Sequence, residues 1–406
     1  MRNQMRNRAL LLVSLSLVLL SCRKEISLWQ FHSKNVRKIS VSNIGQLYRA
    51  VNDSANAGYL IVLAPGTYLL DSTFPNGGRI EFQQDMTLEG QTNHPEEVII
   101  DASSLPGTSF NPPLNFPAAR TGAIRMGRGV NSIEWLTVKG NSNAQALSVI
   151  DTDLIWAGIS RVKIAHSIVT GGRIGIDIRN VGPSSMRRTI EAEITDNNVL
   201  ENLVQFGQGI EVQNANGATG AVIRANLSGN YVHRNKVGLR AFNNNANNTR
   251  SDSGSINIQS RNDRFEENGV GLHLIAGLNQ GSTTTSNGNL LHFDARGTSI
   301  QNNLGTLPPD ITDPSPGGIN ASGGYSINAG LSSNNRLEIS LWDCMTSGNR
   351  GPDINVFGAF STGALPAGTN NLVEIQLKGI SSAATVVSTP SLPAEPVGTN
   401  VVKIFR

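Results

Sequence analysis

One series of side chains, each the third residue of a short repeated phrase, has a chemically useful composition. The series reads Ser148, Asp177, Glu211, Arg240, His273, Asn320 and Asn355. Two adjacent carboxylates raise the pKa of one of them, which suits a general acid. An arginine can hold a substrate carboxylate, and a histidine can transfer a proton near neutral pH. Asp177, Glu211, Arg240 and His273 are therefore the candidate catalytic residues.

A purely structural role for these residues is the alternative. A second series, of the same mixed charge, reads Arg161, Glu191, Arg224, Asn257, His292 and Glu338. Opposite charges on neighbouring strands form stabilising pairs without any catalytic role. Because the chain contains two such series, both the catalytic and the structural interpretation stay open.

The elements that position these residues follow from an internal repeat. Apolar anchors recur mostly 30–35 residues apart, at Val138, Ile168, Val199, Val232, Phe265, Ile300 and Met345. Each anchor is followed by a Gly-Ile or similar segment, such as residues 209–212, and several repeats add an alternating third segment, such as residues 190–194. Alternation with a period of two predicts strands with one buried face and one solvent-facing face.

Such short strands cannot bury their apolar faces alone. Wound into coils and stacked, they enclose a continuous core and pair their backbone groups with the coils above and below. The sequence therefore predicts an all-β, single-stranded, right-handed parallel β-helix, a solenoid with three short strands per coil. In such a stack, equivalent side chains of neighbouring coils lie about 4.8 Å apart.

Asparagines recur at equivalent positions of the repeat. One set lies three residues after the anchors, and a second set lies two residues after the Gly-Ile segments. Asparagine tolerates left-handed backbone, and stacked amides hydrogen-bond along the coil axis. We therefore assign both sets to structure. The first contains Asn202, Asn235, Asn268 and Asn303, and the second contains Asp151, Asn180, Asn214 and Asn243.

The opening of the repeat region resembles that of the pectin-lyase-like β-helix superfamily. Residues 42–57 predict an amphipathic helix with Ser42 as its N-cap, and residues 60–68 read LIVLAPGTY, like the first-coil phrase of that superfamily. In this superfamily an N-terminal helix caps the open end of the core. The resemblance extends over nearly all of the chain after residue 36.

The resemblance implies a polysaccharide or cell-surface glycan as partner. Phe242, Phe357 and Asn320 are then the candidate substrate-binding residues, with Trp342 as a further aromatic surface. Polygalacturonase signatures are absent, since no aspartate precedes the repeated glycines. Asp177 and Glu211 supply at most two calcium ligands, so calcium is conceivable but unsupported, and we expect no required cofactor and no metal site. A lyase or glycosidase of unassigned type and a non-catalytic glycan-binding or adhesion module remain as alternatives.

The N-terminus has the pattern expected of an export signal. Arg2, Arg6 and Arg8 precede an apolar run over residues 9–20 that is too short to span a bilayer. The run ends in Leu-Leu-Ser-Cys, which resembles the lipobox of bacterial lipoproteins. We expect cleavage before Cys22, lipidation of Cys22, and localisation in the cell envelope at the outer membrane.

Composition restricts the partners. Without the three arginines of residues 1–21, 30 basic and 30 acidic residues balance. Nucleic acid and anionic membrane surfaces need a basic surplus, so we expect no nucleic acid and membrane attachment only through the lipid. The expected organisation is a signal peptide (1–21), a tether (22–36), a capping-helix region (37–58) and a β-helix (59–406), present as a monomer.

Overall fold

The computed structural model describes residues 37–106, 121–142, 147–152, 158–181, 188–204, 207–215, 217–245, 252–280, 285–304, 317–327, 330–361, 368–381, 384–392 and 399–406. The expected signal peptide and tether, including Cys22, lie outside the described residues. Everything below concerns the unit Arg37–Arg406.

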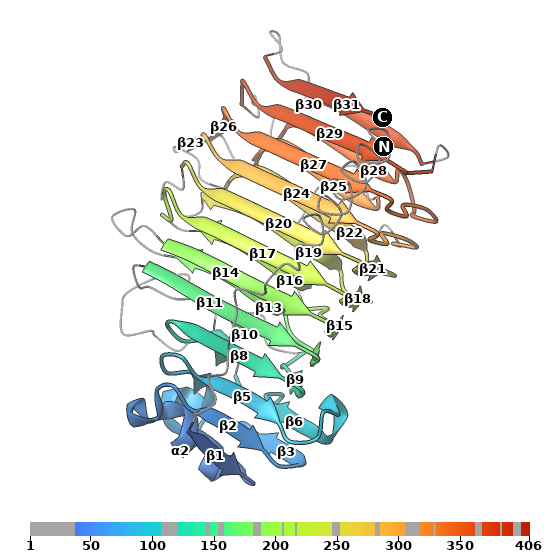
Figure 1. The fold of residues 1–406 in the computed structure, drawn as a ribbon. Helices are drawn as coiled ribbons and strands as arrows, with labels where there is room; N and C mark the ends of the chain where they lie inside the picture. Colours follow the sequence, from blue (N-terminus) through green and yellow to red (C-terminus); the bar gives the residue numbers. More distant parts are fainter. Residues whose placement is uncertain are drawn as a thin grey trace, which may run out of the picture. The chain divides into compact units, whose positions relative to one another are not determined.

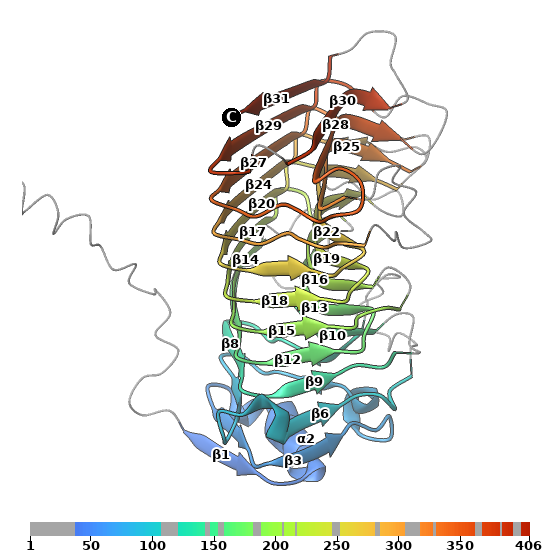
Figure 2. The same ribbon diagram turned by 90° about the vertical axis from the view of Figure 1, so that its right-hand side faces the viewer.

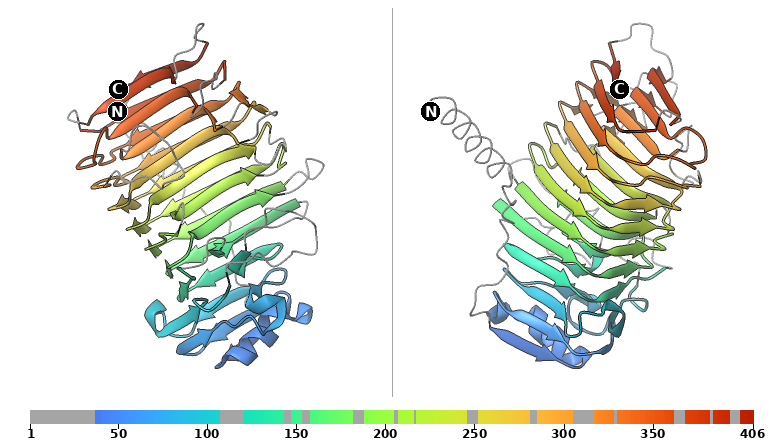
Figure 3. Two further views of the ribbon diagram at one scale, coloured as in Figure 1. Left: turned by 180° about the vertical axis from the view of Figure 1, so that it is seen from behind. Right: turned by 45° about the vertical axis from the view of Figure 1, so that its right-hand side comes forward.

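The described chain winds into a right-handed parallel β-helix, as the sequence predicted. Each coil adds one strand to each of up to three parallel sheets, so strands that are neighbours in a sheet come from successive coils. The colours therefore run in order from blue to red along the stack (Figure 1). Figure 2 turns the seven-stranded sheet toward the viewer, and Figure 3 shows the same coils from behind.

Three sheets make up the walls of the β-helix. The twelve-stranded sheet contains β1 (Lys38–Val41), β2 (Leu60–Leu63), β5 (Thr87–Gly90), β8 (Val130–Glu134), β11 (Gly158–Ala165), β14 (Arg188–Thr195), β17 (Val222–Ser228), β20 (Ser255–Arg261), β24 (Leu290–Arg296), β27 (Arg336–Trp342), β29 (Leu372–Lys378) and β31 (Val401–Phe405). The ten-stranded sheet contains β4 (Ile80–Glu81), β7 (Thr121–Arg125), β10 (Leu147–Asp151), β13 (Ile174–Val181), β16 (Gln208–Ala215), β19 (Val237–Asn245), β22 (Val270–Asn279), β25 (Ile319–Ser326), β28 (Ile354–Ser361) and β30 (Val386–Leu392). The seven-stranded sheet contains β3 (Gly66–Leu69), β6 (Val98–Asp101), β9 (Thr137–Lys139), β12 (Ile168–Thr170), β15 (Asn198–Leu200), β18 (Tyr231–His233) and β21 (Arg264–Glu266).

The remaining elements are short. A small fourth sheet pairs β23 (Thr285–Asn287) with β26 (Leu331–Ser333). Three single 3₁₀ turns, η1 (Ser54–Asn56), η2 (Pro75–Gly78) and η3 (Pro95–Glu97), interrupt the first coils.

The predicted helix is α2 (Ile44–Asn52), and its N-cap is Asn43 rather than Ser42. The Asn43 side chain accepts from the Gln46 backbone N–H at 3.0 Å, while Ser42 donates its backbone N–H to Gln46 Oε1 at 2.8 Å. This reciprocal pair satisfies backbone donors at the start of the helix. Leu47 and Val51 then join the core of the first coils. Parallel pairing begins even before the helix, because β1 pairs with β2.

Alternating burial gives the twelve-stranded sheet one face in the core. In β14, Ile190, Ala192 and Ile194 are buried, whereas Glu191 and Glu193 are only partly so. Burying one such aliphatic side chain contributes about 1.5–3 kcal/mol. Because the same positions repeat in every coil, the apolar residues form one continuous core cluster.

The first predicted asparagine set forms a continuous ladder. Asn235 Oδ1 accepts from the backbone N–H and from Nδ2 of Asn202, both at 3.0 Å, and Asn268 bonds Asn235 in the same way at 3.0 and 3.1 Å. The residue in left-handed backbone is the one before each asparagine, such as Arg234 with φ 53°. The asparagines therefore act through their amides and not through their own backbone conformation.

The second predicted set is confirmed except for Asp151. Asn180 Nδ2 donates to Asn214 Oδ1 at 2.9 Å, and Asn214 Nδ2 donates to Asn243 Oδ1 at 2.8 Å. Asp151 is instead in register with Asp177. Its sequence position was misleading because β10 is paired with β13 in a register that the repeat phrase does not reveal.

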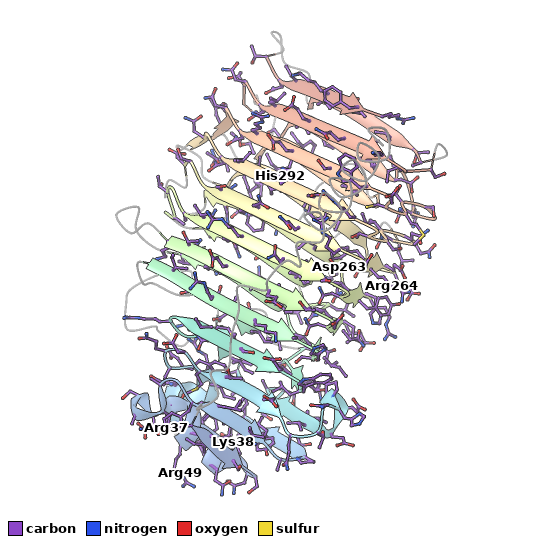
Figure 4. All side chains as sticks on the ribbon, viewed as in Figure 1. Arg37, Lys38, Arg49, Asp263, Arg264 and His292 are labelled. Carbon is purple, nitrogen blue, oxygen red and sulfur yellow. The ribbon has the colours of Figure 1, made fainter. Side chains whose placement is uncertain are left out.

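A further ladder, which the sequence analysis missed, contains a carboxylate. Asp263 Oδ1 accepts from the backbone N–H and from Nδ2 of Asn230 at 2.8 Å, and its Oδ2 accepts from Ser260 Oγ at 2.6 Å (Figure 4). Asn230 bonds Asn197 in the same way, one coil earlier. Burial raises the pKa of Asp263 to about 6, and the hydrogen bonds from Ser260 and Asn230 oppose this shift.

We predict that Asp263→Asn stabilises the protein at neutral pH. Because the folded pKa lies above the unfolded value, the native carboxyl favours its proton, and stability is lost as pH rises through about 6. An asparagine avoids this cost and keeps the acceptor for Asn230, so we expect a gain of about 1–3 kcal/mol. Urea unfolding from acid to neutral pH measures the gain.

The matched control is Asp196→Asn, which removes a carboxylate with a side chain that is 52% exposed. Its effect should stay within about 0.5 kcal/mol. A destabilised Asp263→Asn protein at neutral pH would contradict the prediction.

Candidate functional site

The ten-stranded sheet aligns the candidate catalytic residues across neighbouring coils. Asp177 of β13 is in register with Glu211 of β16, and Glu211 with Arg240 of β19. Arg240 is followed by His273 of β22 and then by Asn320 and Asn355. Below Asp177 the series continues with Asp151 and Arg125, not with Ser148, which pairs with Ile174. We call the aligned residues from Arg125 to Asn355 the buried column.

The predicted solvent exposure of these side chains is wrong. Asp177 and Glu211 are 0% exposed, His273 is 4% exposed and Arg240 is 5% exposed. Every residue of β13, β16 and β22 is buried, so this sheet is covered on both faces. The alternation rule fails here because it assumes one solvent-facing side.

The two central carboxylates share one amide. Gln213, two residues after Glu211, donates from Nε2 to Glu211 Oε1 and to Asp177 Oδ1, the latter at 3.3 Å. Asp177 also accepts from Ser148 Oγ at 3.3 Å. Ser148 thus contacts the column diagonally although it is not in register with Asp177. The acids are therefore coupled through a common donor.

Arg240 is engaged on two sides. Its NH1 lies 3.8 Å from Glu211 Oε2, and its Cζ lies 4.4 Å from the ring centroid of Phe242. Lower in the column, Arg125 Nε lies 3.2 Å from Asp151 Oδ1, another buried ion pair. Arg240 consequently cannot hold a substrate carboxylate unless that anion competes with Glu211.

His273 is neutral near physiological pH. Burial, helped by the positive charge of Arg240, lowers the pKa of His273 to about 3. The sequence analysis expected His273 to transfer a proton near neutral pH, and the low pKa contradicts this. His273 is suited to hydrogen bonding as a neutral ring, with Tyr325 edge-on at 6.4 Å between ring centroids.

Buried amides beside the column lack hydrogen-bond partners. In the described part of the chain, both amide atoms of Gln208, Oε1 of Gln213 and Nδ2 of Asn320 have none. These side chains are 0–1% exposed. Leaving a buried polar group unpaired costs about 1–3 kcal/mol, so each of them is a point where a polar ligand gains binding energy. The sequence analysis named Asn320 and missed Gln208, whose place just before the repeated glycine is the available signal.

Two of the three predicted aromatic surfaces are inaccessible. Phe242 is 1% exposed and Phe357 is 4% exposed. They form a second apolar cluster, outside the main core, with Ile275, Leu278, Tyr325 and Phe360. Asn320 is likewise buried and accepts from Asn355 Nδ2 at 3.2 Å. Trp342 alone of the three predicted aromatics is partly exposed.

The second charged series forms a solvent-facing ladder on the twelve-stranded sheet, as the structural interpretation predicted. Arg161 Nε lies 2.8 Å from Glu191 Oε2, and Arg224 NH1 lies 3.6 Å from Glu191 Oε1. His292 Nδ1 lies 3.1 Å from Glu338 Oε2 (Figure 4). The Arg224 side chain is 59% exposed, so these pairs are screened by solvent. The two series therefore have similar sequences and different environments.

Among the described residues, no group of three His, Cys, Asp or Glu side chains could hold a metal ion. No helix within the described ranges is long and apolar enough to cross a membrane.

Sheet topology and asparagine ladders define the class of the chain as a right-handed parallel β-helix. No protein-family model matches the chain. No curated protein matches it significantly either.

Several solved structures are similar to the chain at low identity. A pectate lyase shares 12% identity over 88% of this chain and 78% of its own, with a TM-score of 0.44. An α-1,3-glucanase from Streptomyces thermodiastaticus shares 10% identity over 92% and 68%, with a TM-score of 0.37. The A-module of a mannuronan C-5 epimerase from Azotobacter vinelandii shares 12% identity over 89% and 93%, with a TM-score of 0.34. Likeness at this level concerns the fold alone.

We predict that Arg240→Ala destabilises the protein by about 3–5 kcal/mol, because it leaves Glu211 buried without this cation. Arg224→Ala, in the exposed ladder, should cost at most about 1 kcal/mol. Urea unfolding of both variants makes the comparison. A double variant, Glu211→Gln with Arg240→Gln, should recover much of the loss. Equal, small effects at both arginines would contradict a desolvated pair.

Proposed function

We propose that this protein binds or processes a polysaccharide at the buried column. The observation that carries the proposal is the convergence of Asp177, Glu211 and Arg240 with the unpaired amides of Gln208 and Asn320. Carboxylates, a guanidinium and amides together match a ligand rich in hydroxyl groups. The resemblance of the sequence to pectin-lyase-like proteins supports a saccharide over other hydroxyl-rich ligands.

If the protein is an enzyme, each residue of the buried column has a role that follows from its functional group. Asp177 and Glu211, which share the Gln213 amide, would hold and release the proton. Arg240 would move from Glu211 to the developing negative charge of the substrate. His273, being neutral, would orient the substrate by hydrogen bonding. Because the column is buried, we expect substrate access to require an opening of this face.

A non-catalytic glycan-binding or adhesion module is the second candidate. The low pKa of His273 and the pairing of Arg240 with Glu211 favour it, because both remove a reactive group from the column. The two candidates differ in one respect only, which is whether a bound glycan is cleaved or modified.

The test combines turnover and binding. We expect the parent protein to release reducing ends or unsaturated, ultraviolet-absorbing products from one member of a panel of acidic and neutral polysaccharides. Asp177→Asn should then lower kcat by about 100-fold or more, the range of general acid–base catalysis, with affinity nearly unchanged. The matched control is Glu191→Gln in the exposed ladder, which should turn over like the parent.

The outcomes separate the candidates. A parent that binds a glycan but turns over none supports the non-catalytic module. A parent that neither binds nor turns over any glycan contradicts the proposal. Equal activity of Asp177→Asn and the parent places the reacting groups elsewhere.

We further propose that the protein is anchored in the cell envelope through a lipid on Cys22, with no other membrane attachment. The lipobox-like end of the apolar run supports this proposal. Cys22→Ala should abolish acyl labelling and move the protein from the detergent phase to the aqueous phase. Unchanged partitioning and labelling would rule out this anchor.

A further inference from the structure

An open hollow of about 560 Å³ lies at the end of the twelve-stranded sheet, on a different sheet from the buried column. Its lining residues are Trp342, Gln376, Leu377, Lys378, Phe405 and Arg406. A volume of this size falls in the range of small-ligand sites. The lining contains one tryptophan, one phenylalanine and two cations, and no Asp or Glu side chain.

Strand register explains how these residues meet. Trp342 of β27 is in register with Lys378 of β29, and Gln376 with Phe405 of β31. Arg296 of β24 precedes Trp342 in the same series. These side chains lie on the face of the sheet opposite the core, and Phe405 is 50% exposed. Three neighbouring strands thus present an aromatic and basic surface.

The Trp342 ring makes cation–π contacts with two basic side chains. Lys378 Nζ lies 5.1 Å from the Trp342 ring centroid, and Arg296 Cζ lies 5.7 Å from it. Such cation–π contacts keep the positive groups beside the ring while leaving them largely hydrated. The carboxylate of Asp294 lies 3.5 Å from Arg296 and 3.9 Å from Arg261. Lys378 itself is exposed and has no carboxylate within ion-pair distance in the described part of the chain.

The neighbouring carboxylates form ion pairs with basic residues other than Lys378. Glu374 contacts Arg336 at 2.9 Å and Lys403 at 3.2 Å. Glu338 contacts Arg336 at 2.5 Å. Lys378 is therefore the exposed cation of the hollow that an incoming anion can reach without displacing an internal carboxylate.

The hollow is extended along the sheet edge. A second cavity of about 320 Å³ shares Leu377, Lys378 and Arg406 with the first. Its other lining includes Ile380, Ala384 and Val386, which are apolar. An elongated surface of this kind suits a segment of a chain molecule better than a single small anion.

We propose that this hollow is a binding site for an acidic glycan, separate from the buried column. The aromatic side chains contact the apolar faces of sugar rings, Gln376 bonds hydroxyl groups, and Lys378 with Arg406 binds carboxylate or sulfate groups. A glycan fits better than nucleic acid, because outside residues 1–21 the chain carries 30 basic and 30 acidic residues and lacks the broad positive field that nucleic acid needs.

The test titrates the full protein with polygalacturonate, and with neutral dextran and single-stranded DNA for comparison. Isothermal titration calorimetry should show polygalacturonate binding that weakens with salt, and little binding of dextran or DNA. Trp342→Ala and Lys378→Gln should each weaken polygalacturonate binding by about tenfold, a loss of about 1.4 kcal/mol. The controls are Trp135→Phe and Lys139→Gln, on other parts of the β-helix, which should bind like the parent.

The buried column is tested separately in the same experiment. Asp177→Asn should retain polygalacturonate binding at the hollow even if it loses turnover, so the two proposals can fail independently. Unchanged affinity in both Trp342→Ala and Lys378→Gln, equal binding of dextran, or tighter binding of DNA would each overturn the assignment of the hollow.

Discussion

The backbone of this β-helix is paired almost entirely between coils and not within them. A strand such as β16 pairs its backbone groups with β13 and β19, its neighbours in the stack. Where the chain turns, the backbone groups would be left unpaired, and the asparagine ladders supply the missing partners. Every other feature depends on this coil-to-coil register, because it fixes which side chains lie above one another.

The coil-to-coil register stacks charged side chains on two sheets, with different consequences for stability. On the twelve-stranded sheet it stacks charges that solvent screens, so Arg161, Glu191 and Arg224 contribute little and cost little. On the ten-stranded sheet it stacks charges that are buried. Glu211 and Arg240 there form an ion pair that compensates their desolvation, and burial lowers the pKa of His273 so that its ring is neutral. The same geometric rule thus yields a solvent-exposed ladder on one sheet and a desolvated polar cluster on another.

The two proposed sites also differ in how far their charged groups are removed from water. In the buried column, polar groups interact strongly but are inaccessible in the described structure, so a ligand must gain entry before it can react. At the hollow beside Trp342, the Lys378 side chain is exposed and each contact would be weak, so the proposed binding would need several contacts along a chain.

The sequence by itself determined the coil architecture, because a repeat of short alternating strands with asparagines at fixed offsets has few other ways to bury its apolar faces. It also determined the alignment of Asp177, Glu211, Arg240 and His273, because the Gly-Ile segment recurs once per coil and each of these residues is its third position. Tertiary structure alone decided the register of Asp151, the burial of Phe242 and Phe357, and the protonation of His273. The reason is that alternation reports which face of a strand points away from the core, whereas exposure depends on what else lies against that face.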